Sequence, residues 1–89
     1  MRERFKVAGS SKPNAIAGAI AGSIREGNDV VIQAIGAAAV NQTMKAAAIA
    51  NGYLAPTGKT IICTPAFAEC TVNGQIKTSL DLFISAKAN

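Results

Sequence analysis

The segment from Gln33 to Ala50, QAIGAAAVNQTMKAAAIA, constrains the fold more than any other part of the chain. An apolar run over residues 30–35 ends at Gly36, and a helix built mainly of alanine follows. Such a run is typical of a strand buried on both faces. Because alanine has a short side chain, the helix is able to lie very close to whatever it contacts. The segment therefore predicts a buried strand followed directly by a closely packed helix.

A strand and a helix are expected before this segment. Residues 4–8 alternate basic and apolar side chains, which is typical of a half-buried strand. Pro13 suits the first turn of a helix over residues 14–26, and a serine just upstream is expected to cap it. Apolar residues at helical spacing predict the face that packs into the core. They are Ile16, Ala17, Ile20 and Ile24.

The alanine-rich helix is predicted over residues 38–51, with Gly52 ending it. Its expected core face carries Val40, Met44 and Ala47. On the opposite side, within about 100° of arc, lie Asn41, Gln42 and Lys45. The helix therefore presents a polar surface away from the core.

Two long strands, at residues 60–72 and 75–86, are predicted to form a hairpin around Asn-Gly. This dipeptide favours a type I′ turn, in which the two residues that flank the turn pair with each other. Counting back from the turn places three pairs on the core face: Phe67 with Leu80, Pro65 with Leu82, and Cys63 with Ile84. Because proline has no N–H for the ladder, its strand is expected at a sheet edge or with a bulge.

These elements follow one another in the order β-α-β-α-β-β, which predicts an α/β fold in which a parallel strand pair is joined by an antiparallel hairpin. One domain over residues 1–89 is expected, because so short a chain does not bury two cores. Hydrophobic residues make up 49% of the chain and aromatic residues only 4%, which favours close backbone packing. The first two strands are expected to be parallel.

Charge and missing motifs narrow the function. Nine basic and five acidic residues give a net charge of +4, which permits an anionic partner such as nucleic acid. The chain has no histidine, no G-x-S-x-G motif and no Walker A motif, so no enzyme activity is expected. Two cysteines alone do not make an ordinary zinc site, and neither metal nor cofactor is expected. With no secretory leader and no membrane-spanning run, a cytoplasmic protein without membrane contact is predicted.

Polar residues at three places are candidates for contact with nucleic acid. At the start of the first helix, a lysine, hydroxyls and free amides suit phosphate oxygens. The start of the second helix is expected at the same edge of the sheet, because both helices follow parallel strands. Lys77 is the cation of the hairpin tip. The candidates are Ser11, Lys12, Asn14, Asn41, Gln42, Lys45 and Lys77.

Some of these residues have a second interpretation. Asn41 and Gln42 are equally able to pair across a symmetric dimer, and small residues on both helices leave room for a partner to approach closely. The candidate interface residues of a homodimer or higher homo-oligomer are Gly18, Gly22, Asn41 and Ala48. The alternative function is a structural or protein-interaction module that assembles through these faces without binding nucleic acid. A third possible function is the binding of a small anionic ligand at residues 10–14.

Motifs spread over the whole chain point to a known family. They are SSKPNAIAGA at 10–19, QAIG at 33–36, VNQ at 40–42, KA at 45–46, IANGYLAP at 49–56 and PAF at 65–67. In these motifs the chain resembles the bacterial stage V sporulation protein S family. The resemblance implies a bacterial branch of the Alba fold, a two-layer α+β sandwich with a four-stranded mixed sheet in the order 1-2-4-3 and both helices on one face. It also implies oligomers, nucleic-acid binding and a regulatory role linked to sporulation.

One part of the chain departs from the Alba pattern. Archaeal Alba proteins carry a lysine in the first strand–helix turn, which Lys12 matches, and arginines around the glycine of the second turn, where this chain has Ile35 and Ala37. Losing two phosphate contacts reduces the salt dependence of binding by roughly 1.8 in logarithmic slope. Sequence-tolerant binding of DNA or RNA is therefore expected to be weaker than that of Alba, or to use a different surface.

Overall fold

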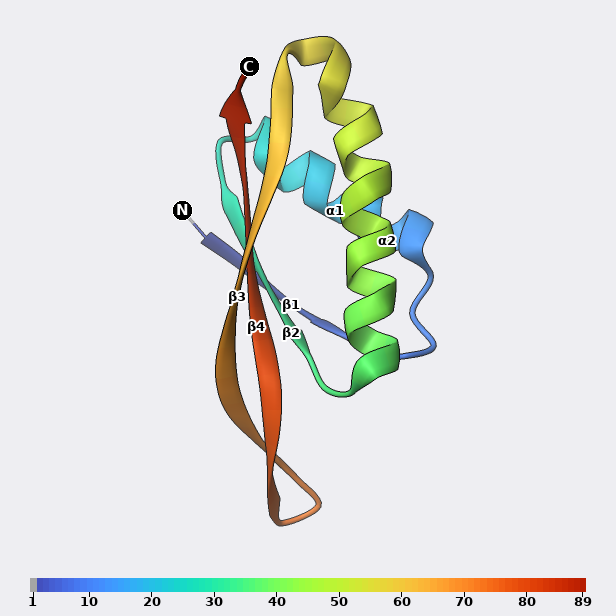
Figure 1. The fold of residues 1–89 in the computed structure, drawn as a ribbon, viewed down its shortest axis with the longest axis vertical. Helices are drawn as coiled ribbons and strands as arrows, with labels where there is room; N and C mark the ends of the chain where they lie inside the picture. The colour runs from blue at the N-terminus through green and yellow to red at the C-terminus, as the bar shows by residue number, and fades with distance from the viewer. Residues whose placement is uncertain (1) are drawn as a thin grey trace.

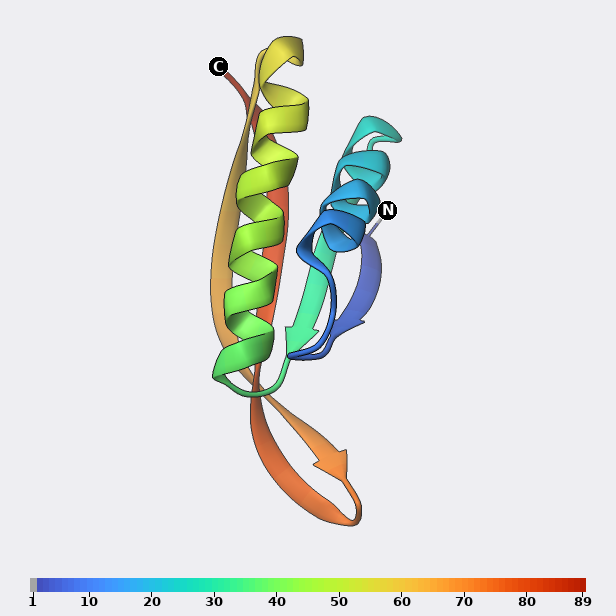
Figure 2. The same ribbon diagram turned by 90° about the vertical axis from the view of Figure 1, so that its right-hand side faces the viewer.

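The computed structural model describes residues 2–89 and contains a four-stranded sheet covered on one face by two helices (Figure 1, Figure 2). The strands are β1 (Arg2–Val7), β2 (Asp29–Ala34), β3 (Lys59–Val72) and β4 (Gln75–Ala88). The helices are α1 (Pro13–Arg25) and α2 (Ala37–Leu54), and a short 3₁₀ helix, η1 (Ala55–Thr57), follows α2. The predicted element order and the two-layer α+β class are confirmed.

The strands lie in the order β1-β2-β4-β3. β1 and β2 are parallel, and β4 is antiparallel to both of its neighbours. The hairpin has the predicted register, with Cys63 opposite Ile84 and Phe67 opposite Leu80. Its turn residues Asn73 and Gly74 have φ values of 51° and 76°, as a type I′ turn requires. β3 forms an edge of the sheet, which confirms the position expected from Pro65.

The hydrophobic core lies between the helices and the central strands β2 and β4. β2 is buried from residue 30 to residue 34, with no side chain more than 9% exposed, as its apolar run predicted. Ala17, Ile20 and Ile24 of α1 are buried, in agreement with the predicted core face. The buried residues of α2 are Ala39, Thr43, Ala46, Ala47, Ala50 and Leu54.

The predicted core face of α2 was wrong at Met44, which is 38% exposed. Thr43 is fully buried, and its hydroxyl donates a hydrogen bond to the carbonyl of Ala39 at 2.9 Å. A threonine whose hydroxyl is satisfied within its own helix packs as a small apolar residue. Apart from Leu54, the inward face is therefore built from small side chains, and it is rotated away from Met44.

The predicted end of α2 was also wrong. The helix continues through Gly52 to Leu54, which is fully buried, and Pro56 and Gly58 follow it in η1 and its cap. Burying a leucine stabilises a fold by about 1.5–3 kcal/mol, whereas a glycine within a helix costs about 1 kcal/mol. The buried leucine therefore decides where the helix ends. The other predicted boundaries lie within two residues of the observed ones.

The expected serine cap of α1 is absent from the described structure. Lys12 is the N-cap residue, and its side chain makes no capping hydrogen bond. The Ser11 hydroxyl instead accepts a hydrogen bond from the backbone N–H of Ala8 at 3.0 Å. The serine therefore stabilises the loop before the helix rather than the helix start.

The β3–β4 hairpin projects beyond the two helices (Figure 1). The last pair between β2 and β4 joins Ala34 to Leu80, so residues 68–79 form an arm with no neighbouring strand. Phe67 lies at the base of this hairpin arm and is 86% exposed, although its strand position was predicted to face the core. The register was correct, but at this point of the sheet no helix covers the ring.

Candidate nucleic-acid interface

The loop between β1 and α1 is held against the start of α2. The side-chain amide of Gln42 donates a hydrogen bond to the carbonyl of Ser11 at 2.8 Å. Gly9 lies so close to α2 that an added Cβ would come within 2.8 Å of the Ala38 Cβ. A glycine is therefore required at this point by close approach. Gly9 was not among the predicted site residues, because the alanine that it approaches lies on another element.

Lys12 and Lys45 lie on one groove between the start of α1 and the exposed side of α2. This lysine groove has a volume of about 740 Å³. Its lining residues are Lys12, Pro13, Asn14, Ala15, Lys45, Ala48 and Ile49. Within residues 2–89 no acidic side chain lines it, and neither lysine forms a salt bridge. Three predicted site residues, Lys12, Asn14 and Lys45, are thus brought together in a groove of positive charge.

The start of α1 offers fewer free amides than the sequence suggested. Pro13 has no N–H, and the amides of Ala15 and Ile16 both donate to the carbonyl of Lys12, at 3.1 and 3.2 Å. An anion at this helix start would therefore depend on the lysine side chain more than on the backbone.

The start of α2 is more open. Gly36, with a φ of 87°, turns the chain into the helix, and no side chain caps the helix start. The amide of Val40 is the first to donate within the helix, to Gly36 at 3.2 Å. Ala37 and Ala38, both exposed residues, precede it, and the first turn carries no acidic residue. The positive end of the helix dipole is thus not neutralised at this edge of the sheet.

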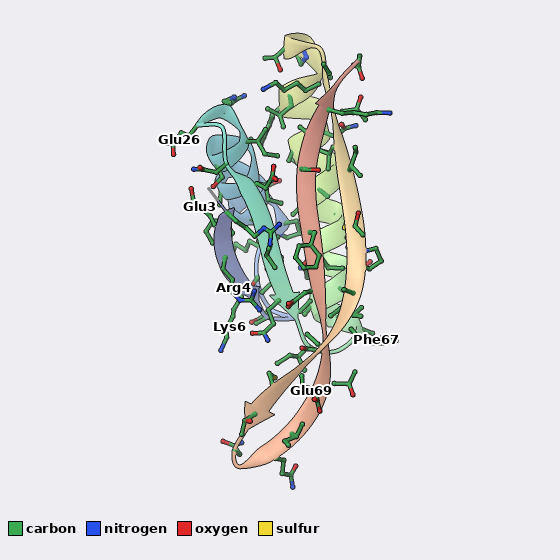
Figure 3. All side chains as sticks on the ribbon, turned by 90° about the vertical axis from the view of Figure 1, so that its left-hand side faces the viewer. Glu3, Arg4, Lys6, Glu26, Phe67 and Glu69 are labelled. Carbon is green, nitrogen blue, oxygen red and sulfur yellow. The ribbon has the colours of Figure 1, made fainter. Side chains whose placement is uncertain are left out.

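Arg4 lies on the open face of the sheet, away from the helices (Figure 3), and both arginines of β1 have partners within the chain. Arg4 forms an ion pair with Asp81 at 3.2 Å, and the Arg2 guanidinium lies 5.2 Å from the centre of the Phe83 ring. These contacts occupy two of the nine cations in intramolecular interactions. The lysines of the lysine groove have no such partner in the described part of the chain.

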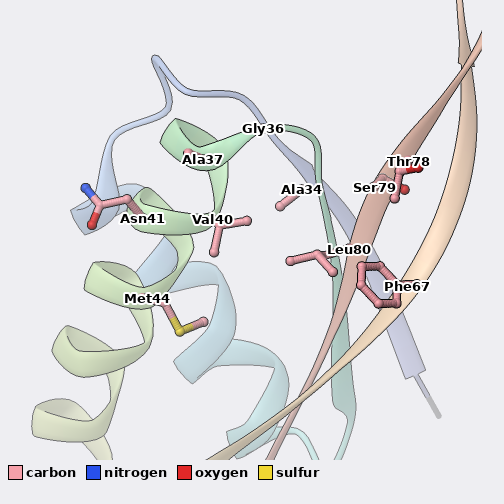
Figure 4. Close-up of a pocket in the computed structure, with 10 residues that line it drawn as sticks. All are labelled: Ala34, Gly36, Ala37, Val40, Asn41, Met44, Phe67, Thr78, Ser79 and Leu80. Atoms are coloured by element: carbon pink, nitrogen blue, oxygen red, sulfur yellow. The ribbon is translucent and has the colours of Figure 1, made fainter.

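The predicted polar cluster on α2 is divided by the structure. Gln42 is half-buried and holds the β1–α1 loop, and Lys45 lines the lysine groove. Asn41 is exposed and lines a second groove, between α2 and the base of the hairpin arm (Figure 4). Lys77 lies on the hairpin arm and lines neither groove.

The second groove, called the apolar groove below, has a volume of about 490 Å³. Its lining residues are Ala34, Gly36, Ala37, Val40, Asn41, Met44, Phe67, Thr78, Ser79 and Leu80. In Figure 4, Val40 and Met44 approach from α2, while Leu80 and Phe67 come from the hairpin. Phe67 and Met44 were not among the predicted site residues, since both had been assigned to the core.

The candidate interface residues lie on different surfaces. Gly18 is exposed and Gly22 half-buried on α1, and a Cβ added at either would meet no atom within 4 Å. Ala48 lines the lysine groove and Asn41 the apolar groove. The two glycines are therefore not required by packing within the chain.

Other kinds of site find little support in residues 2–89. No cluster of histidine, cysteine and carboxylate side chains is suited to holding a metal ion there. Both cysteines are free, and burial raises the pKa of the Cys63 thiol, which packs beside the core. Neither described helix combines the length and apolar character needed to span a membrane.

A known protein family matches nearly the whole chain. The family described as stage V sporulation protein S (SpoVS) matches residues 3–87. The match includes the loop that carries Lys12, all of α2 and the hairpin arm. The chain therefore belongs to the stage V sporulation protein S family of sporulation-related proteins.

Proposed function

We propose that this protein binds nucleic acid through the lysine groove, without catalysing a reaction and with little dependence on base sequence. One observation carries the proposal: Lys12 and Lys45 line the same groove with Asn14, and no acidic side chain lines it among the described residues. Lysines that contact phosphates supply affinity that is independent of sequence. The protein would act in sporulation as a small nucleic-acid-binding regulator.

The surroundings of the groove favour contact with the phosphate backbone over direct reading of bases. Apart from its lysines and Asn14, the groove is lined by proline, alanine and isoleucine. Direct reading of a base sequence needs several side chains in bidentate geometry, and Asn14 is the one side-chain amide that lines the groove among the described residues. The loop before Lys12 is fixed by Gln42 and by the Ser11 hydroxyl, so the lysine starts from a rigid backbone.

The expected binding is weak and sensitive to salt. Two lysine–phosphate contacts give a logarithmic salt slope of about −1.8 on duplex DNA, so affinity falls roughly tenfold between 50 and 200 mM salt. Assembly of two copies on one nucleic acid doubles the slope to about −3.6. We include a homodimer or higher oligomer in the proposal, supported by the exposed small residues of α1 that serve no packing purpose within the chain.

The test is a binding titration of labelled duplex DNA and RNA at low salt, with the mass of the protein measured alongside. Lys12→Glu/Lys45→Glu is expected to abolish binding, because four units of charge change at the groove. Lys59→Glu/Lys87→Glu is the matched control. It changes the net charge by the same amount, at the end of the hairpin that lies away from the Asn-Gly turn. Equal loss in both double variants would contradict the site, because net charge alone would then explain binding. A wild-type protein that assembles but binds neither DNA nor RNA would indicate the alternative, an interaction module.

A further inference from the structure

Phe67 is an aromatic ring that the fold leaves uncovered. It is 86% exposed, at the base of the hairpin arm, and lies beside the apolar groove. Figure 4 shows it on one side of the groove, with Met44 of α2 on the other and Leu80 between them. The ring contributes little to the chain's own core and is accessible to a group from outside the chain.

The groove beside this ring suits a flat, mostly apolar group. This open groove of about 490 Å³ is lined by the apolar side chains of Val40, Met44 and Leu80, and its polar side chains are those of Asn41, Thr78 and Ser79. No charged residue of the described chain lines it. A nucleobase has these properties, with two apolar faces and polar atoms at its edge, and single-strand-binding proteins stack bases on aromatic side chains.

The arrangement of the two grooves also complements the negative charge of a nucleic acid. Asn41 lines the apolar groove, and Lys45, one helical turn later, lines the lysine groove. The uncapped start of α2 borders the apolar groove at Gly36 and Ala37. A polyanion that carries aromatic bases therefore finds positive charge and an aromatic platform on opposite sides of one helix ridge.

A second copy of the chain fits this surface less well. Each copy carries a net charge of +4, which opposes the association of two copies at low salt and attracts a polyanion. Glu69 lies two residues beyond Phe67 on the same face of β3 (Figure 3). Its carboxylate disfavours phosphates on this face of the arm, since Lys77 lies on the opposite face.

We propose that single-stranded nucleic acid binds across α2, with one base stacked on Phe67 in the apolar groove and the adjoining phosphates at the lysine groove. This inference rests on the proposed function and deepens it by naming the form of nucleic acid. A duplex keeps its bases stacked within the helix and offers none to Phe67. Stacking tolerates any base, so the preference concerns strandedness and not sequence.

The test compares a labelled oligothymidylate with a duplex of the same length, using full-length protein at low salt. Phe67→Ala is expected to weaken single-strand binding by about 5- to 150-fold, the range for loss of one stacked base, and to leave duplex binding unchanged. Ile76→Ala is the matched control, because Ile76 is 71% exposed on the same hairpin but does not line the groove. Phe67→Trp introduces the first tryptophan into the chain, and its fluorescence should be quenched by the oligothymidylate.

The outcomes separate this inference from the proposed function. If Lys12→Glu/Lys45→Glu abolishes binding while Phe67→Ala leaves single-strand affinity intact, stacking is refuted and the lysine groove stands. If the wild-type protein binds neither probe, both proposals fail. If Phe67→Ala halves the molecular mass without changing single-strand affinity, a second copy covers the groove and the inference is overturned. Since Phe67 is exposed, the variant should unfold at the same temperature as wild type.

Discussion

Replacing Gly9 with alanine tests the contact that positions the β1–α1 loop on α2. The new Cβ would lie 2.8 Å from the Ala38 Cβ, where ordinary contacts are 3.4–4 Å. Overpacking of this kind costs about 1–3 kcal/mol, and the reduced entropy of the unfolded chain offsets about 0.4–1 kcal/mol. The net loss in the free energy of unfolding is therefore centred on about 1.3 kcal/mol, which lowers the melting temperature by about 5–10 °C.

A second substitution identifies the cause of that loss. The other Ala38 atoms near the added Cβ, the backbone C and Cα, lie at 3.9 Å, so Ala38→Gly removes the clash. Alone, Ala38→Gly is expected to cost up to about 1 kcal/mol in helix propensity. In its background, Gly9→Ala should no longer destabilise the protein, which corresponds to a coupling energy of about 1–3 kcal/mol.

The assay is urea unfolding of the four proteins of this cycle, followed by circular dichroism. Gly52→Ala serves as a control for glycine replacement in general, because Gly52 lies within α2, outside the candidate interface, and a Cβ there meets nothing within 4 Å. It should stabilise the protein by about 0.5–1 kcal/mol, since alanine is the better helix former. Additive effects of Gly9→Ala and Ala38→Gly would refute the close contact between loop and helix.

Two further predictions concern single side chains. Gln42→Ala removes the hydrogen bond to Ser11 and should lower the free energy of unfolding by about 1 kcal/mol in urea, while Asn41→Ala, at an exposed position, should not. If both variants unfold alike, the amide does not hold the loop. Because burial raises the pKa of Cys63, the unfolded thiol ionises at a lower pH than the folded one. The contribution of Cys63 to the free energy of unfolding should be constant below the ordinary thiol pKa and should fall as the pH rises through it. Cys63→Ala should lose this fall. If the pH profile of stability is the same in the variant and the wild type, the effect is contradicted.

Local signals in the sequence were sufficient for the sheet. The Asn73-Gly74 turn fixed the register of the entire hairpin, because a two-residue type I′ turn leaves no freedom in pairing. The apolar run of β2 correctly indicated a strand buried on both faces. The strand order followed from family resemblance and not from the pattern of residues.

The site could be predicted only in part, since it depends on how far elements extend relative to one another. Phe67 is exposed because the hairpin extends beyond the two helices. No residue pattern along β3 reveals how far it extends. The core face of α2 is hidden in an alanine-rich helix, where Met44 dominated the apolar pattern although Thr43 is the buried residue. A search for small residues at positions 39, 43, 46 and 50 would have found the inward face. Lys12 and Lys45 were correctly singled out, but their shared groove required the structure.

The most direct test of nucleic-acid binding at the lysine groove is the salt dependence of affinity for duplex DNA. Wild-type protein and Lys12→Ala/Lys45→Ala are compared over a range of salt concentrations, with mass measured at each. If both lysines contact phosphates, the double variant loses about 1.8 units of logarithmic slope per protein copy. An unchanged slope in a folded variant would show that the phosphates are bound elsewhere and would contradict the proposed interface.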